Sequence, residues 1–243
     1  MQRLFIFSGQ IAGEKCVIQE KEIVHYIKNV LRCKMGERFV VVDEKGDEYN
    51  AQVKEISKEA VMLEIERKLP PRPRVTSVTI ACAIPKNSRF DDIIDKLTQL
   101  GVDRIIPLVT ERVVVRLDAA AGAARIQCWK KIAAAASQQS QRNSLPVIEA
   151  PKTFKEVLSE SGEYDVKLIP TLADDRRTLK ELLIRQGPRK FLILVGPEGD
   201  FSHEEVALAK GQGFIPVTLG DLVLRVETAA VAIASFIRFY ENS

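Results

Sequence analysis

The sequence predicts an α/β protein in which a small N-terminal β-barrel precedes a larger domain with a parallel sheet. Residues 1–68 contain short strand-like runs around one helical segment, whereas from residue 75 onward apolar strands alternate with helices. Between the two patterns lies LPPRPR, residues 69–74, and three prolines in six residues suit neither a helix nor a sheet. We therefore expect domains at 1–70 and 71–243.

The N-terminal part reads as four strands and a helix. The strands are expected at 4–7, 39–43, 48–56 and 60–66, and EKGD forms a plausible hairpin turn between the second and the third. Residues 22–32 place Ile23, Ile27, Val30 and Leu31 at helical spacing. A small β-barrel with one helix follows from this order.

The C-terminal part repeats a strand and then a helix. Strands are expected at 75–84, 104–109, 164–170, 191–195 and 214–220. Helices are expected at 89–100, 125–139, 178–186 and 227–241, and a further helix is expected to begin at Ser202. Continuous apolar strands in such a repeat are typical of a parallel sheet covered on both faces. Ligands bind such sheets outside the carboxyl ends of the strands, where GPEG and the loop 219–229 lie.

Composition excludes several classes of protein. The chain of 243 residues is 46% hydrophobic and 28% charged, as in globular proteins, and no apolar run reaches the roughly 20 residues of a membrane span. The first ten residues do not resemble a signal peptide. Four scattered cysteines without a CxxC pair indicate neither a metal site nor a disulfide framework. We expect a cytoplasmic protein with reduced cysteines and no bound metal.

Positive charge is concentrated in the middle of the chain. Residues 71–150 contain 12 lysines and arginines against 7 acidic residues, whereas the net charge of the whole chain is only +3. A localised basic face is what a nucleic-acid partner requires, although a basic solvated surface would give the same count.

The stretch LVGPEGDFSHEEV, residues 194–206, predicts a stiff loop between a buried strand and a well-capped helix. Ser202 and Glu205 form a capping box, and Phe201 and Val206 are placed as a hydrophobic staple. GPEG lacks the GK[ST] of a phosphate loop and is not GxGxxG. Its two glycines permit close backbone approach, which suits a neutral or cationic small ligand. An ordinary tight turn is the alternative.

Several ordered motifs resemble a known family. GPEG before a capped helix, and LGDLVLRVETA at 219–229, are similar to the SPOUT superfamily of S-adenosylmethionine-dependent RNA methyltransferases. HYIKNVLRCKMGERFVVVD, KLTQLGVDRIIPLVTERVVVR and QRNSLPVIE extend the likeness over the whole chain to the RsmE family, the 16S ribosomal RNA uracil-N3 methyltransferases (family target m3U1498). The resemblance implies a PUA-like N-terminal barrel and a C-terminal domain with a deep trefoil knot.

The resemblance also implies where S-adenosylmethionine binds. The matching loops are 169–175, 195–200 and 219–229, and the expected cofactor-binding residues are Thr171, Leu172, Gly196, Glu198, Gly199, Leu219, Gly220, Leu224, Val226, Thr228 and Ala229. Family members commonly have GPEGG and LGPRILRTETA, from which this chain departs at Asp200, Asp221, Leu222 and Val226. These departures affect the details of side-chain contacts.

Catalysis and RNA binding are assigned within this likeness. Arg225 is expected to stabilise the negative charge that develops on uracil, and Glu227 is a candidate base or a helix-capping carboxylate. The candidate RNA-binding residues are Arg3, Arg32, Arg89, Arg112, Arg116, Arg142 and Asn143, and the partner is 16S ribosomal RNA or the small ribosomal subunit. The last helix, with Val231, Ile233, Phe236, Ile237 and Phe239, predicts a homodimer. A non-catalytic RNA-binding or assembly factor and a nucleotide-binding α/β enzyme are the alternatives.

Overall fold

The computed structural model describes residues 2–43, 46–70, 76–85, 89–112, 119–140, 142, 144–173, 175–182 and 189–241. The chain forms two compact units. One comprises Met1–Pro73 with Ser137–Leu145, and the other comprises Arg74–Ala136 with Pro146–Ser243. The grouping of Ser137–Leu145 with the N-terminal unit is not evident from the sequence, because these residues lie inside the alternating strand-and-helix region.

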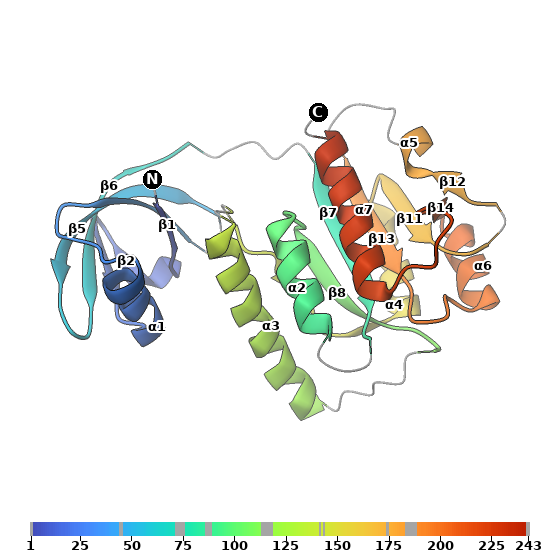
Figure 1. Cartoon of the computed structure of the whole chain (residues 1–243), viewed down its shortest axis with the longest axis horizontal. Helices are drawn as coiled ribbons and strands as arrows, with labels where there is room; N and C mark the ends of the chain where they lie inside the picture. The colour runs from blue at the N-terminus through green and yellow to red at the C-terminus, as the bar shows by residue number, and fades with distance from the viewer. Residues whose placement is uncertain are drawn as a thin grey trace. The chain divides into compact units, whose positions relative to one another are not determined.

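The first unit is built on a six-stranded sheet in the order β1-β4-β5-β6-β3-β2. Figure 1 labels β1, β2, β5 and β6 of this sheet. Its strands are β1 (Gln2–Phe5), β2 (Ile11–Ala12), β3 (Lys15–Ile18), β4 (Arg38–Val42), β5 (Glu48–Ile56) and β6 (Val61–Lys68). Only β1 and β4 pair in parallel among the described strands of this sheet. The core contains Leu4, Ile18, Ile27, Phe39 and Leu63.

Two features of this unit differ from the sequence expectation. Strands β2 and β3 were not expected, although the alternation of exposed and buried residues in β3 is typical of a half-buried strand. The expected helix at 22–32 is an α-helix, α1 (Lys21–His25), that continues as a π-helix, η2 (Tyr26–Val30), and it ends before Arg32. Arg32 has a φ of 52°, a left-handed conformation that ends helices.

The second unit contains the predicted parallel sheet. Its order is β10-β8-β7-β13-β11-β14-β12, with β9 paired to β8, and every recorded pair of described strands is parallel. The strands are β7 (Ser77–Ala83), β8 (Arg104–Val109), β9 (Val147–Ile148), β10 (Lys152–Thr153), β11 (Val166–Pro170), β12 (Arg177–Thr178), β13 (Lys190–Val195) and β14 (Ile215–Thr218). The α/β fold class is thereby confirmed.

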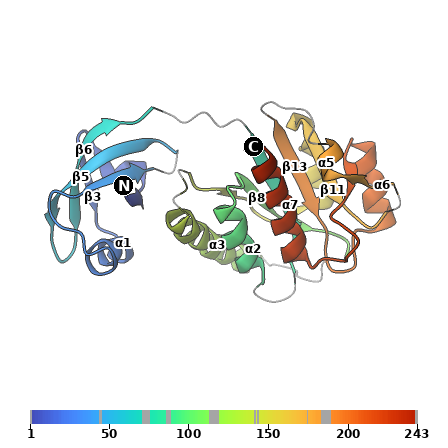
Figure 2. The same ribbon diagram turned by 45° about the horizontal axis from the view of Figure 1, so that its top comes forward.

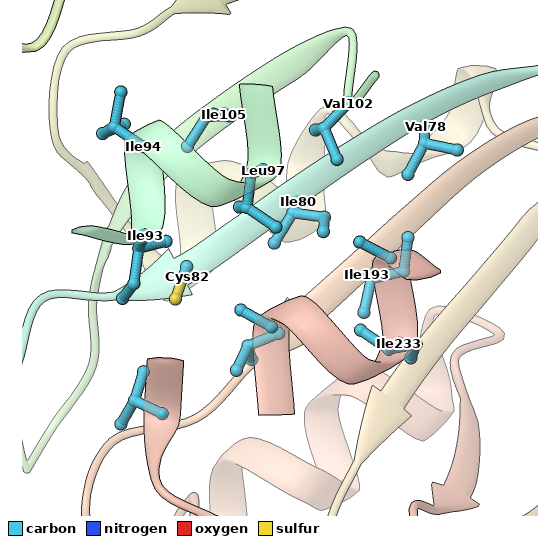
Figure 3. Close-up of a cluster of buried hydrophobic side chains, with 14 of the residues drawn as sticks. Val78, Ile80, Cys82, Ile93, Ile94, Leu97, Val102, Ile105, Ile193 and Ile233 are labelled. Carbon is cyan, nitrogen blue, oxygen red and sulfur yellow. The ribbon is translucent and has the colours of Figure 1, made fainter. Parts of the chain in front are cut away.

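Side chains of the central strands fill a core on each face of this sheet. In β13, Phe191 and Ile193 belong to one cluster, whereas Leu192 and Leu194 belong to the other. Figure 3 shows the first cluster, in which Ile80 and Cys82 of β7 gather with Ile93 and Ile233 from helices. Burial on both faces explains why these strands read as uninterrupted apolar runs rather than as an alternation.

Helices cover both faces of the sheet (Figures 1 and 2). Helices α2 (Arg89–Gln99) and α7 (Val226–Glu241) lie side by side. Helix α3 (Ala119–Gln139) contributes Trp129 to the same core. The Trp129 ring packs against Phe90, and its N–H donates a 2.9 Å hydrogen bond to Asp91. The opposite core takes side chains from α4 (Phe154–Ser159) and α6 (His203–Gly211). Helix α5 (Leu179–Leu182) completes the described α-helices, and two 3-10 helices, η1 (Ser8–Gln10) and η3 (Ser161–Glu163), are also present.

Helices α3 and α4 differ from expectation. Helix α3 begins at Ala119, six residues earlier than expected, since the preceding alanines favour a helix. Helix α4 was missed, although its capping box between Thr153 and Glu156 is visible in the sequence TFKE. In the described part of the chain, no helix is long and apolar enough to cross a membrane.

Candidate cofactor site

Three neighbouring strands end side by side at one edge of the parallel sheet. Strands β13, β11 and β14 are adjacent, and their last residues are Val195, Pro170 and Thr218. The loops that follow surround a cavity of about 330 Å³. Its lining consists of Pro170, Thr171, Leu172, Arg176, Val195, Gly196, Pro197, Glu198, Gly199, Asp200, Val217, Leu219, Gly220, Leu222, Val223, Leu224, Arg225, Val226 and Ala229. The fold therefore brings together three loops that are far apart in the sequence.

Most residues expected at the cofactor line this cavity. They are Thr171, Leu172, Gly196, Glu198, Gly199, Leu219, Gly220, Leu224, Val226 and Ala229. Thr228 is different, since it is exposed in the first turn of α7 and is not part of the lining. Successive positions of a helix lie on different faces, so Thr228 faces away from the cavity that Val226 and Ala229 line.

The GPEG segment is a tight turn closed by a hydrogen bond of 3.1 Å from the Asp200 N–H to the Pro197 carbonyl. Gly199 has a φ of 93°, as the third residue of a type II turn requires. A Cβ at Gly199 would meet no atom of the chain within 4 Å, so it would stand in open space beside the cavity. The positive φ of the turn therefore favours glycine at position 199, and the absence of a side chain there leaves room for a ligand.

Gly196 is small for another reason. A Cβ at this position would lie 2.9 Å from the ring of Phe201, which is buried in the core beneath α6. The glycine thus permits an internal packing contact. Both glycines were expected to admit a ligand, and the contact with Phe201 distinguishes Gly196 from Gly199.

The predicted start of helix α6 is confirmed. Ser202 is the N-cap, its side chain accepts from the Glu205 N–H at 3.3 Å, and Glu205 accepts from the Ser202 N–H at 3.0 Å. Phe201 and Val206 are both buried in one core. Glu205 also accepts a 3.0 Å hydrogen bond from the Glu111 N–H, which ties the end of β8 to this helix. The helix start is consequently a fixed support for the turn.

Asp200 follows the turn with a φ of 67°, a conformation in which glycine is more common than other residues. Its Oδ2 accepts from the Thr171 hydroxyl and from the Leu172 N–H, each at 2.8 Å. Arg112 approaches the same turn and donates to the carbonyl oxygens of Gly199 and Asp200. The contacts of Asp200 and Arg112 were not foreseen from the sequence, because their partners are remote along the chain.

The loop from Leu219 to Arg225 also depends on a left-handed glycine. Gly220 has a φ of 115°, and a Cβ there would meet no atom of the chain within 4 Å. The Thr218 hydroxyl accepts from the Gly220 N–H at 3.1 Å and so fixes the bend. Leu222 and Val223 line the cavity while remaining 80% and 78% exposed. This loop offers apolar surface to the cavity and to solvent.

The two candidate catalytic residues occupy different places. Arg225 lines the cavity, is exposed, and makes no hydrogen bond or ion pair with the described residues through its side chain. Its carbonyl accepts from the Ala229 N–H at 2.8 Å, so Arg225 immediately precedes α7. Glu227 lies in the first turn of α7 and does not line the cavity.

Glu227 influences a buried thiol. Burial raises the pKa of the Cys82 thiol above its usual range, and the negative charge of Glu227 raises the pKa further. Glu227 is therefore near the C-terminal part of β7. A carboxylate in the first turn of a helix is also stabilised by the helix dipole.

The candidate RNA-binding residues divide by exposure. Arg32 and Arg112 are exposed, whereas Arg142 is buried and Arg3 forms an ion pair of 3.1 Å with the buried Glu48. Arg89 is the first residue of α2, but its side chain lies outside the described structure. Arg116 and Asn143 lie outside the described residues. Arg32 and Arg112 are thus the members of this set that the structure shows at the surface.

A second cavity, not foreseen from the sequence, adjoins the first. Its volume is about 450 Å³, and it shares Thr171, Leu172, Gly199 and Asp200 with the first cavity. Arg112, His203 and Lys210 also line it, and Lys210 pairs with Asp175 at 2.6 Å. Within the described residues, no group of three or more His, Cys, Asp or Glu side chains is placed to hold a metal ion.

Comparison with known proteins identifies the family. A family model described as an RNA methyltransferase domain matches residues 71–238, and one described as an RNA methyltransferase PUA domain matches residues 18–66. The chain is 33% identical over 243 residues to the ribosomal RNA small subunit methyltransferase E of Synechocystis sp., covering 99% of this chain and 78% of the relative. It is 30% identical over 247 residues to the protein of the same name from Bacillus subtilis, covering 98% and 96%.

Solved structures agree with this relationship. A methyltransferase from Legionella pneumophila, solved in complex with the bound cofactor SAM, has a TM-score of 0.84 at 30% identity and covers 98% of this chain and 96% of its own. The ribosomal RNA small subunit methyltransferase E of Neisseria gonorrhoeae, bound to S-adenosyl methionine, has a TM-score of 0.82 at 28% identity and covers 98% and 97%. The resemblance seen in the sequence is thus confirmed: the chain carries an RNA methyltransferase domain after a PUA domain and belongs to the ribosomal RNA small subunit methyltransferase E family.

Proposed function

We propose that this protein transfers a methyl group from S-adenosylmethionine to N3 of one specific uridine in the 16S RNA of the small ribosomal subunit. The observation that carries the proposal is the cavity of about 330 Å³ at the ends of β11, β13 and β14, because it is lined by the loops that match the family's cofactor motifs. The names of the relatives support the ribosomal RNA substrate. The choice of N3 of uridine rests on the sequence resemblance.

The residues of the cavity fit the proposed cofactor. A volume of about 330 Å³ is within the usual range of small-molecule sites, roughly 300–1,000 Å³. Gly199 and Gly220 leave open space where other residues would place a side chain. Leu172, Leu219, Leu224 and Val226 supply apolar contact, as a pocket for an adenosyl group requires. A ligand could therefore approach the backbone closely at these two glycines.

S-adenosylmethionine supplies an electrophilic methyl group when it is bound. We assign to Arg225 the task of stabilising the negative charge that spreads over the uracil carbonyl oxygens as N3 loses its proton. Its exposure at the rim of the cavity and its lack of a side-chain partner among the described residues leave its donors available. A preorganised cation at the developing charge accelerates the reaction in the manner of an oxyanion hole.

Glu227 is the other candidate for the reaction. Its position outside the cavity lining and near Cys82 favours a role at the start of α7 over direct proton transfer. In that role, Glu227 would hold the start of the helix that follows Arg225.

RNA binding is assigned to both parts of the chain. We propose that residues 1–70 form an RNA-binding PUA-like β-barrel and that residues 71–243 form a SPOUT methyltransferase domain with a trefoil knot. Arg32 and Arg112 are the exposed candidates for phosphate contacts. Arg89, Arg116 and Asn143 remain in the proposed set, and the partly buried Arg3 and the buried Arg142 would act by supporting the surface.

We also propose that the protein is a cytoplasmic homodimer. On α7, Phe239 is 66% exposed, and Phe236 stacks on Tyr240 with ring centroids 6.1 Å apart. Ile233 and Ile237 of the same helix are buried in the core of the unit, so they do not contribute to a surface for a partner. The exposed aromatic side chains near the C-terminus of the helix are therefore the apolar surface that a second copy would cover.

Two measurements test the function. Titration of the protein with S-adenosylmethionine should give saturable binding, whereas ATP and NAD should give none. Mass spectrometry of small-subunit RNA from a strain lacking the gene should show loss of 3-methyluridine, restored by the wild-type gene. Absence of cofactor binding would favour a non-catalytic assembly factor, and protection by ATP or NAD would favour a nucleotide-binding enzyme.

A further inference from the structure

One carboxylate joins two of the three loops around the cavity. Asp200 Oδ2 accepts hydrogen bonds from the Thr171 hydroxyl and from the Leu172 N–H, both at 2.8 Å. Asp200 Oδ1 accepts from the Phe201 N–H, also at 2.8 Å. Both oxygens are therefore engaged, and hydrogen bonds to an ionised acceptor are stronger than those between neutral groups.

The backbone at this position would suit glycine. Asp200 has a φ of 67°, which L-residues adopt at a cost, although aspartate and asparagine tolerate it better than most. The GPEGG motif that this stretch resembles has glycine here, so the aspartate of this chain adds a side chain where the turn needs none. The aspartate side chain forms hydrogen bonds with Thr171 and Leu172 that a glycine at this position could not form.

The link lies in a wall between two cavities. Thr171, Leu172, Gly199 and Asp200 line both the cavity of about 330 Å³ and that of about 450 Å³. Arg112 holds the carbonyl oxygens of Gly199 and Asp200, so the turn is also tied to the end of β8. Movement of the 171–173 segment away from the turn would change the shape of the first cavity.

We propose that Asp200 is a positioning residue that fastens the 171–173 segment to the GPEG turn and so preorganises the cavity for S-adenosylmethionine. This inference rests on the proposed function. Holding a binding loop in its bound conformation lowers the ordering cost of binding. Asp200 acts through Thr171 and Leu172, and its removal is expected to affect cofactor retention more than the chemical step.

The test compares Asp200→Gly, Asp200→Asn and wild type. Asp200→Gly removes the link but keeps a residue suited to the backbone, and we expect the Kd for S-adenosylmethionine to rise about tenfold, equivalent to about 1.4 kcal/mol. Asp200→Asn keeps one acceptor oxygen without the charge and should raise the Kd about threefold. At saturating cofactor, the single-turnover rate of both variants should stay within about twofold of wild type.

Asp221→Asn is the matched control. Asp221 is exposed on the neighbouring loop and does not line the cavity, so the substitution removes the same charge without removing a link. Its Kd should equal that of wild type. An equal rise in Kd for Asp221→Asn and Asp200→Asn would overturn the inference, because it would show a general effect of charge.

Two further measurements separate positioning from a structural effect. Hydrogen exchange of the Leu172 amide in cofactor-free protein should be at least about tenfold faster in Asp200→Gly than in wild type. In a double-mutant cycle, Thr171→Val should weaken binding in the wild-type background and have little further effect in Asp200→Gly. Unchanged exchange at Leu172, or additive effects of the two substitutions, would refute the link. If wild-type protein bound no S-adenosylmethionine, the proposed function would fail, and this role of Asp200 would fail with it even if the exchange measurement showed the link.

Discussion

Gly199→Val gives the sharpest test of the cofactor cavity. The wild-type residue has a φ of 93°, and its absent side chain would point into open space beside the cavity. Forcing a β-branched residue into this conformation costs about 1–2 kcal/mol. For a chain of this size, that loss corresponds to a fall in Tm of roughly 2–8 °C. The protein should therefore remain folded at 25 °C.

Cofactor affinity should change much more than stability. The valine side chain would add bulk at the lining of the cavity of about 330 Å³, where S-adenosylmethionine is proposed to bind. We expect the Kd for S-adenosylmethionine to rise on the order of 100-fold or more, which corresponds to about 2.7 kcal/mol. Isothermal titration calorimetry would measure the affinity, and thermal denaturation in the absence of cofactor would measure the stability.

Gly213→Val is the matched control for the backbone. Gly213 has a φ of 82°, and a Cβ there would make ordinary contact with Lys167 at 3.5 Å, away from the cavity lining. This variant should lose a similar amount of stability and bind the cofactor as wild type does. Wild-type affinity in folded Gly199→Val would refute the placement of the cofactor against this turn. Equal losses of affinity in both variants would show that backbone strain alone weakens binding.

Three other predictions concern catalysis, RNA and assembly. Arg225→Ala should keep the Kd for S-adenosylmethionine within about threefold but lower the single-turnover methylation rate on the order of 100-fold, and Arg225→Lys should restore only part of the rate; a wild-type rate in Arg225→Ala would contradict the assignment. Arg112→Ala should weaken RNA binding, reduce the slope of log K against log salt by about 0.7–0.9, and raise the Kd for the cofactor severalfold because the turn loses its contact to Gly199 and Asp200. An unchanged salt slope would remove Arg112 from the RNA contacts. Light scattering at micromolar concentration should give the mass of a dimer, and Phe239→Glu should shift it toward the monomer; a wild-type monomer would exclude the proposed dimer.

Local features of the sequence determined most of the secondary structure. Strands β5 and β8 have the bounds expected from the sequence, and the capping box of Ser202 and Glu205 forms as predicted. These features depend on residues a few positions apart, so they are readable from the sequence alone. Short elements such as β9 and β10 were missed, because two-residue strands are defined by their pairing with β8 and carry no periodicity of their own.

Only the tertiary structure decided how the site is assembled. The order β13-β11-β14 brings the loops after Val195, Pro170 and Thr218 to one cavity, and the sequence order of these strands does not state which are neighbours. Gly196 is explained by the ring of Phe201, and Asp200 is explained by Thr171, 29 residues away. Contacts of this kind depend on strand pairing and packing between distant segments, for which the local sequence contains no signal.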